Sequence, residues 1–140
     1  MTREEFEIKL IEDLVKGIDD IYDYIHDNLE VLQKNKDYFR EYFLNNPYYA
    51  YFYAKYVDKG PMEDTRKAAC KDPEYAYYYA VYVDKGPRDD TRKAACRDSE
   101  NAYYYARFVD ECPRDDTFKA VKGTDWEEEY IEDIGSPNND

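Results

Sequence analysis

The fold is decided by one stretch of the chain, which reads Asp72-Pro73-Glu74-Tyr75-Ala76-Tyr77-Tyr78-Tyr79-Ala80 and, after three further residues, Asp84-Lys85-Gly86-Pro87. The same pattern returns at a period of 26 residues, so that three copies occupy Pro47–Asp72, Pro73–Asp98 and Ser99–Thr124. A fixed period of this length is typical of repeat architectures, in which each unit stacks on its neighbours.

Each copy is predicted to form two helices. Asp72 is a favourable N-cap, and Pro73 suits the first helical turn, where its missing N–H is not needed. Gly86 can adopt the left-handed conformation that ends a helix, and Pro87 prevents the helix from continuing. The second helix has roughly ten residues, too few to be stable alone, so it must pack against its neighbours.

Small side chains recur along one side of the first helix. Ala76, Ala80 and Val83 stand at i, i+4 and i+7, which places them in one stripe and lets neighbouring helices approach closely. Larger side chains are expected beside this stripe and on the adjacent face: Tyr79, Tyr75, Tyr78 and Tyr82. The sequence therefore predicts an all-α fold, a short α-solenoid of helical-hairpin repeats.

The segments on either side of the repeats, residues 1–46 and residues 123–140, are also predicted to be helical. The N-terminal segment opens with a capping box at Thr2 and Glu5 and forms either one long helix over Arg3–Leu32 or two helices broken near Gly17. A further short helix is expected over Asp37–Leu44. We therefore divide the chain into an acidic N-terminal helical segment (1–46), three repeats (47–122) and an acidic capping helix with a tail (123–140).

The C-terminal helix is expected to cap the open end of the repeat stack, because a terminal unit needs a polar outer face. Three apolar side chains at i, i+4 and i+8 form its docking stripe, with a fourth beside them: Trp126, Tyr130, Ile134 and Ile131.

The repeat pattern around Asp72–Pro87 resembles short α-solenoid repeats found in uncharacterised bacteriophage proteins. The resemblance covers Pro47 to about Lys122 and does not extend to the two ends. It implies an origin in a phage or another mobile element, and hence the cytoplasm of an infected bacterial host. Such repeats are a scaffold with no assigned chemistry, so the resemblance supplies no catalytic residue.

Negative charge is concentrated at the two ends. The chain has 33 acids, 20 bases and a net charge of −13. Residues 1–46 hold 12 acids and 6 bases, residues 47–122 hold 14 of each, and residues 123–140 hold 7 acids and no base. This surplus disfavours direct binding to DNA, RNA or an anionic membrane, whose phosphates are bound by Lys and Arg. The chain has no run of about 18 apolar residues, so no membrane-spanning helix is expected, and its three cysteines are expected to be reduced thiols.

Little in the sequence indicates catalysis. His26, the only histidine, has no serine or cysteine partner at a recognisable spacing and is expected to be a solvated surface residue. Cys70 and Cys96 occupy equivalent small core positions and lack the neighbouring Cys or His of a zinc site. Acid pairs are expected at the start of each second helix, where the helix dipole stabilises negative charge. The alternative interpretation is that these pairs bind a divalent cation: Glu63/Asp64, Asp89/Asp90 and Asp115/Asp116. No enzyme activity, cofactor or metal ion is expected.

The 18 tyrosines are divided between packing and recognition. Those that return in every repeat are expected to pack between hairpins: Tyr51, Tyr53, Tyr77, Tyr79, Tyr103 and Tyr105. Tyr75 and Tyr82 are expected to be partly exposed and to form part of a protein interface, because Tyr gives a large amphipathic contact area at low entropic cost. Stacking on nucleic-acid bases would need a basic groove, which the charge-balanced repeats do not supply.

Two functions are compatible with this sequence. The first is a non-enzymatic inhibitor, similar to an anti-CRISPR protein, that imitates nucleic acid and occupies the basic, nucleic-acid-binding cleft of a host defence nuclease. The partner-binding residues expected for it are Asp13, Asp20, Asp23, Asp27, Glu30, Glu127, Glu128 and Glu129, together with Tyr75 and Tyr82.

The second function is a protein-interaction scaffold or self-associating module. A heptad seam on the N-terminal segment would pair with a second copy to form a homodimer: Ile11, Leu14, Ile18, Ile21 and Ile25. The same seam could instead pack onto the repeats of its own chain, which is the preferred interpretation.

Overall fold

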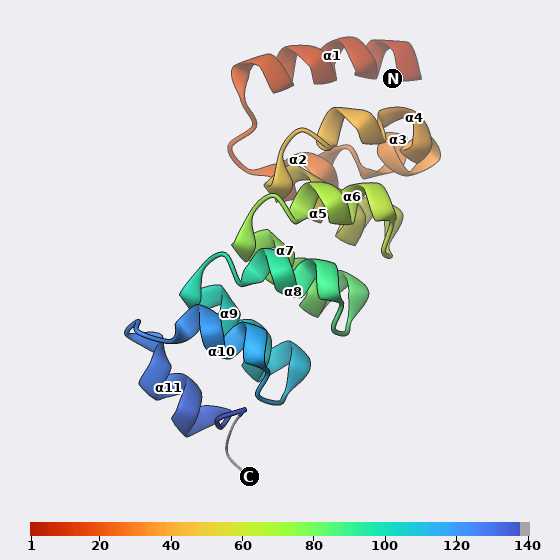
Figure 1. Ribbon diagram of the computed structural model, residues 1–140. Coiled ribbons are helices and arrows are strands. Elements are labelled where there is room, and N and C mark those ends of the chain that lie inside the picture. The colour runs from red at the N-terminus through yellow and green to blue at the C-terminus, as the bar shows by residue number, and fades with distance from the viewer. Residues whose placement is uncertain (138–140) are drawn as a thin grey trace. The chain divides into compact units, whose positions relative to one another are not determined.

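The computed structural model describes residues 1–137 and, over that range, contains helices and no strand (Figure 1). The predicted all-α class is therefore confirmed. Contacts divide the chain into two compact units, Met1–Ala68 and Ala69–Asp140. The end of the predicted tail, residues 138–140, lies outside the described residues. No helix in residues 1–137 is long and apolar enough to cross a membrane.

The first unit is built from short helices. They are α1 (Arg3–Lys16), α2 (Ile21–Asp27), α3 (Leu29–Lys34), α4 (Lys36–Phe39) with a 3₁₀ turn (Arg40–Phe43), α5 (Pro47–Tyr53) and α6 (Glu63–Ala69), which reaches the boundary. The break predicted near Gly17 in the second alternative is confirmed, because Gly17 takes φ 90° directly after α1. A further break at Asn28, between α2 and α3, was not predicted. The helix predicted over Asp37–Leu44 corresponds to α4 and its 3₁₀ turn.

The core of the first unit forms between α1, α2, α3, α4 and α5. Its fully buried side chains are Phe6, Leu10, Ile21, Ile25, Leu32, Phe39, Phe43 and Tyr53. The Phe6 and Phe39 rings meet edge to face at a centroid distance of 5.2 Å. The predicted seam divides here: Ile21 and Ile25 pack into this core, whereas Ile11 is exposed. Packing of the seam onto its own chain is thus confirmed for Ile21 and Ile25, and for Leu14 and Ile18, which are partly buried against the same core, and it is wrong for Ile11.

The second unit repeats one helical hairpin. Its helices are α7 (Pro73–Tyr79), α8 (Asp89–Ala95), α9 (Ser99–Tyr105), α10 (Asp115–Val121) and α11 (Trp126–Asp133). α7 packs against α8 and α9 against α10, and α9 also contacts α7 and α8 (Figure 1). α11 packs on α9 and α10. Of its predicted docking stripe, Tyr130 is fully buried and Trp126 and Ile134 pack around it, whereas Ile131 is exposed and takes no part.

The N-cap residues extend the repeat on both sides of residues 47–122. Asp20, Asn46, Asp72 and Asp98 stand 26 residues apart, and the side chain of each accepts a backbone N–H from the first turn of α2, α5, α7 or α9. Thr124 follows at the same interval, and its hydroxyl accepts the N–H of Trp126. The capping position of the repeats therefore recurs before α2, within the N-terminal segment, and before α11.

The first helix of each repeat ends in a π-helical turn followed by a left-handed residue. These turns span Ala54–Asp58, Ala80–Asp84 and Ala106–Asp110. The left-handed residues are Lys59, Lys85 and Glu111, with φ of 57°, 57° and 56°. The prediction that Gly86 takes this conformation is wrong by one residue: Lys85 takes it, and the N–H groups of Lys85 and Gly86 both donate to the Ala80 carbonyl oxygen. Cys112, at the position of Gly86, is tolerated because that position needs no positive φ.

A buried tyrosine hydroxyl ties the first helix of one repeat to the second helix before it. Tyr105 is fully buried. Its hydroxyl accepts the N–H of Arg88 at 3.0 Å, donates to the Arg88 carbonyl oxygen at 3.1 Å and lies 2.7 Å from Oγ1 of Thr91. Tyr130 makes the same three contacts with Arg114 and Thr117. In the first unit, Tyr53 donates to the carbonyl oxygen of Lys36.

A buried ion pair forms a second tie at the same level. The guanidinium of Arg92, on α8, lies 2.7 Å from the carboxylate of Asp110, whose side chain is 2% exposed. Arg40 pairs with Asp58 at 2.9 Å in the first unit, 52 residues earlier in both partners. The hydrogen bond with Asp110 raises the pKa of Arg92 further above its ordinary value despite burial. Removing one partner would leave a buried, uncompensated charge, which is strongly destabilising.

Replacing Gly86 with Ala tests which residue carries the left-handed conformation. A Cβ at Gly86 meets no atom within 4 Å, and its φ is not left-handed. We therefore expect Gly86→Ala to leave the free energy of unfolding unchanged or to raise it by about 0.5 kcal/mol. Lys85→Gly should raise it by up to about 1 kcal/mol, because glycine adopts φ near +57° without strain. Urea unfolding followed by circular dichroism measures both, and a loss above about 1 kcal/mol in Gly86→Ala would contradict this assignment.

Candidate interaction surfaces

Three of the predicted acidic residues come together on α2. Asp20 caps the helix by accepting the N–H of Asp23 at 3.0 Å. Asp23 and Asp27 follow at i+3 and i+7, so the three carboxylates lie on one exposed face. Asp19, which the sequence analysis did not select, is also exposed beside them. We name Asp19, Asp20, Asp23 and Asp27 the α2 acidic patch.

The α2 acidic patch lacks local charge compensation. No ion pair joins its four carboxylates to a Lys or Arg in the described part of the chain. The pKa of Asp23 is raised above its ordinary value, first by the charge of Asp20, then by desolvation, by the hydrogen bond with Asp20 and by the charge of Asp27. His26 acts in the opposite direction. The folded chain thus holds like charges together at this surface.

Asp13 and Glu30, also predicted to bind a partner, do not belong to the patch. Asp13 lies on α1, where its carboxylate accepts from the Tyr24 hydroxyl at 2.9 Å and from Lys9 at 3.2 Å. Burial is the largest influence and acts to raise the pKa of Asp13, but the two hydrogen bonds and the charges of Lys9 and Lys16 together lower it. Glu30 lies on α3 and pairs with Lys34 at 3.0 Å. Both carboxylates are therefore partly neutralised by residues of their own chain.

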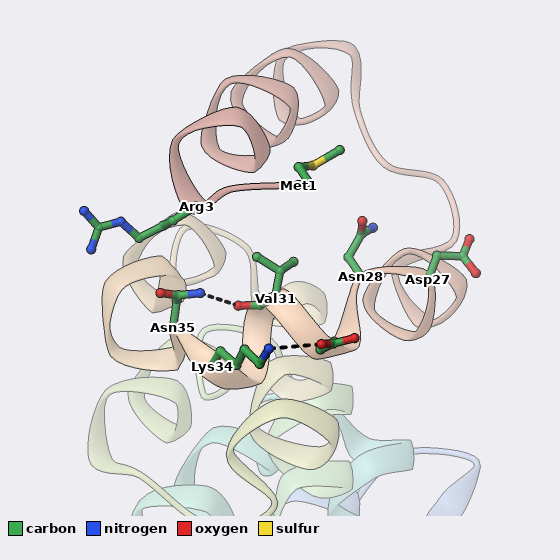
Figure 2. Close-up of a pocket in the computed structure, with 8 residues that line it drawn as sticks. Met1, Arg3, Asp27, Asn28, Val31, Lys34 and Asn35 are labelled. Atoms are coloured by element: carbon green, nitrogen blue, oxygen red, sulfur yellow. Dashed lines mark hydrogen bonds and ion pairs between the residues drawn. The ribbon is translucent and has the colours of Figure 1, made fainter.

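A cleft of about 610 Å³ lies in the first unit beside the patch (Figure 2). It is lined by Met1, Arg3, Asp27, Asn28, Glu30, Val31, Lys34 and Asn35. Figure 2 shows the Asp27 carboxylate directed away from Lys34, which pairs instead with Glu30. Two acids and two bases line the cleft, so its charge is balanced, unlike that of the patch.

The second unit carries the C-terminal acidic residues. Glu127, Glu128 and Glu129 occupy the first turn of α11, where negative charge is favoured by the helix dipole. The carboxylate of Glu127 accepts the N–H of Gly123 at 3.2 Å. Glu128 and Glu129 are exposed. Part of this cluster thus stabilises the start of α11, and two carboxylates remain at the surface.

The two selected tyrosines differ in exposure. Tyr82 is 51% exposed, whereas Tyr75 is half-buried against Tyr78 at a centroid distance of 5.8 Å. The neighbouring pairs Glu74/Tyr78 and Glu100/Tyr104 line a groove in this unit and were not predicted as site residues. Their 26-residue spacing was a signal that could have identified them.

The candidate catalytic and metal-binding groups have structural neighbours instead. His26 is exposed, its ring rests on that of Tyr22 at 4.1 Å, and its Nδ1 lies 2.8 Å from the Tyr22 carbonyl oxygen. Asp90 pairs with Arg88 and Asp116 with Arg114. In residues 1–137, no group of three or more His, Cys, Asp or Glu side chains is placed to hold a metal ion.

Comparison of the chain with protein-family models, with curated proteins and with solved structures finds no match.

The like charges of the α2 acidic patch have a measurable consequence. Because the folded state disfavours ionised Asp23, its carboxyl should titrate above 3.8, and its ionisation should destabilise the fold as the pH rises through that range. Carbon-13 NMR of the side-chain carboxyls measures this pKa. Asp20→Asn preserves the N-cap and removes the main repulsion, so it should lower the pKa of Asp23 towards 3.8. An unchanged pKa in that variant would contradict the electrostatic explanation.

Proposed function

We propose that this protein is a non-enzymatic inhibitor that uses the α2 acidic patch to occupy the basic cleft of a nucleic-acid-binding protein. The observation that carries this proposal is the exposed, uncompensated group of carboxylates on α2. A target cleft that binds phosphates offers Lys and Arg side chains, and these would relieve the repulsion that the folded chain maintains. Charge of opposite sign would also speed the encounter.

The support beneath the patch favours such recognition. Ile21 and Ile25 on the opposite face of α2 are fully buried, and Asp20 is fixed by its capping hydrogen bond. Carboxylates held on a packed helix lose little conformational entropy on binding, which favours affinity. Glu128 and Glu129 would supply a second acidic contact from the other unit. The resemblance of the repeats to bacteriophage proteins makes a host defence nuclease, such as a CRISPR effector, the proposed target, in the cytoplasm of an infected bacterium.

A second candidate function is self-association through α1. Ile8, Ile11 and Val15 stand at i, i+3 and i+7 on this helix, and all three side chains are exposed. Exposed apolar stripes of this kind mark protein contacts. Sedimentation of the free protein separates the candidates: a dimer that Ile11→Ser abolishes would favour the scaffold, and a monomer would favour the inhibitor.

Neutralising three of the four patch carboxylates should weaken inhibition. In a triple variant Asp20→Asn, Asp23→Asn and Asp27→Asn, each lost surface charge pair is worth about 0.5–1 kcal/mol, so affinity should fall by about ten- to a hundredfold. The measurement is displacement of labelled guide RNA or duplex DNA from a panel of purified RNA-guided and restriction nucleases at low salt.

The matched control removes three other exposed or half-exposed acids outside the patch: Glu41→Gln, Glu63→Gln and Asp115→Asn. It changes the net charge equally and should retain inhibition. If both variants lose inhibition equally, the net charge of the chain and not the patch is responsible. If the unmodified protein displaces nucleic acid from no nuclease in the panel, the proposal is refuted. Inhibition should weaken as salt rises, because surface charges are screened.

A further inference from the structure

A groove of about 510 Å³ crosses the surface of the second unit between α7 and α9. Four aromatic rings line it: Tyr77, Tyr78, Tyr104 and Phe108. The Tyr77 and Tyr104 centroids are 5.8 Å apart with 31° between the ring planes, and Tyr104 and Phe108 are 6.3 Å apart with 34° between theirs. Phe108 is 51% exposed. Together the rings form a continuous aromatic surface that water can reach.

Three carboxylates share this groove: Glu74, Asp98 and Glu100. The pKa of Tyr78 is raised to about 12, first by burial and then by its hydrogen bond with Glu74. Burial and Glu100 likewise raise the pKa of Tyr104. Asp98 accepts the N–H and the Nδ2 group of Asn101 at 3.1 Å and 2.7 Å. A carboxylate can accept about four hydrogen bonds, so each retains acceptor capacity.

Every charged side chain that lines the groove is acidic. Its lining contains three carboxylates and neither Lys nor Arg, although the repeats as a whole carry equal numbers of acids and bases. A ligand that complements it must therefore be cationic. It must also be flat enough to lie on aromatic rings and carry several N–H donors. The guanidinium group meets all three requirements, because it stacks on aromatic faces and forms forked hydrogen bonds with carboxylates.

The same unit already uses this chemistry internally. Arg92 lies 5.6 Å from the Tyr105 ring centroid while it bonds to Asp110. Arg107 lies 5.0 Å from the Phe108 ring centroid and donates to the Tyr103 hydroxyl at 2.7 Å. In both cases an arginine of the chain lies near an aromatic ring and donates a hydrogen bond, to a carboxylate in one case and to a tyrosine hydroxyl in the other. Arg107 thus already contacts one ring of the groove, Phe108, whereas the lining itself offers carboxylates and tyrosine rings and contains no arginine.

We propose that this groove binds an arginine side chain presented by an exposed segment of a partner protein. The guanidinium lies on the Tyr104 ring and donates to the carboxylates of Glu74 and Glu100. The groove and the α2 acidic patch share no residue and belong to different units. The inference therefore goes beyond the proposed function, and either can fail without the other.

The test is an NMR titration of the full chain with the peptide acetyl-Gly-Gly-Arg-Gly-Gly-amide. Two comparison peptides replace Arg with Lys or with citrulline, which is its uncharged analogue. We expect the arginine peptide to shift the ring signals of Tyr77, Tyr78 and Tyr104 and to bind about tenfold more tightly than citrulline, given a desolvated cation–π contact with a charge-assisted hydrogen bond. Equal binding of citrulline, equal binding of lysine, or no shift of these signals would overturn the proposal.

Two pairs of variants locate the binding site. Glu74→Gln/Glu100→Gln should weaken binding of the arginine peptide about tenfold, whereas Glu63→Gln/Glu111→Gln, with the same charge change outside the groove lining, should not. Phe108→Ser should also weaken binding, whereas Tyr82→Ser should not, because Tyr82 is equally exposed at the equivalent repeat position outside the lining. Far-UV circular dichroism verifies folding of each variant. Equal effects within either pair would overturn the assignment, and nuclease displacement should be unchanged in the Glu74→Gln/Glu100→Gln and Phe108→Ser variants.

Discussion

A phenolic hydroxyl cannot be buried without hydrogen-bond partners, and in this protein those partners lie on the preceding helix. Tyr105 reaches both backbone groups of Arg88 and the hydroxyl of Thr91, and Tyr130 reaches their counterparts. An unpaired group at such a site would cost about 1–3 kcal/mol, so only one register of the helices satisfies the tyrosines. The tyrosine follows its threonine by 14 residues in the Thr91–Tyr105 pair and by 13 in the Thr117–Tyr130 pair, so α11 makes the same contact with a shift of one residue.

The ion pairs explain how charge is divided between the interior and the surface. Within the repeats, Arg92 is committed to Asp110 and Asp89, and Arg88 to Asp90. The balance of 14 acids and 14 bases in residues 47–122 is therefore used partly for internal structure. The aspartates of α2 have no such partners in the described residues. This contrast is the physical reason to seek a protein partner at the ends of the chain.

Local chemistry was predictable from the sequence, and long-range contacts were not. The N-cap at Asp72 and the proline after it depend only on neighbouring residues, and the structure confirms both. Gly86 was assigned one residue too late because the π-helical turn shifts the helix end, which no local pattern indicates. Asp20, Asp23 and Asp27 share a face by helical periodicity alone. The ion pair of Asp13 with Lys9 is local and was readable from the i,i+4 spacing, whereas the hydrogen bond from Tyr24 comes from another helix and was not.

The tyrosine hydroxyl contact is tested most directly by a double-mutant cycle between Tyr105→Phe and Thr91→Val, measured by urea unfolding. We expect Tyr105→Phe to lower the free energy of unfolding by about 1–3 kcal/mol, with a coupling to Thr91→Val of at least about 0.5 kcal/mol. Tyr82→Phe, at an exposed tyrosine, should change it by less than about 0.5 kcal/mol. If Tyr105→Phe costs no more than Tyr82→Phe and the two changes are additive, the hydroxyl does not hold the repeats in register.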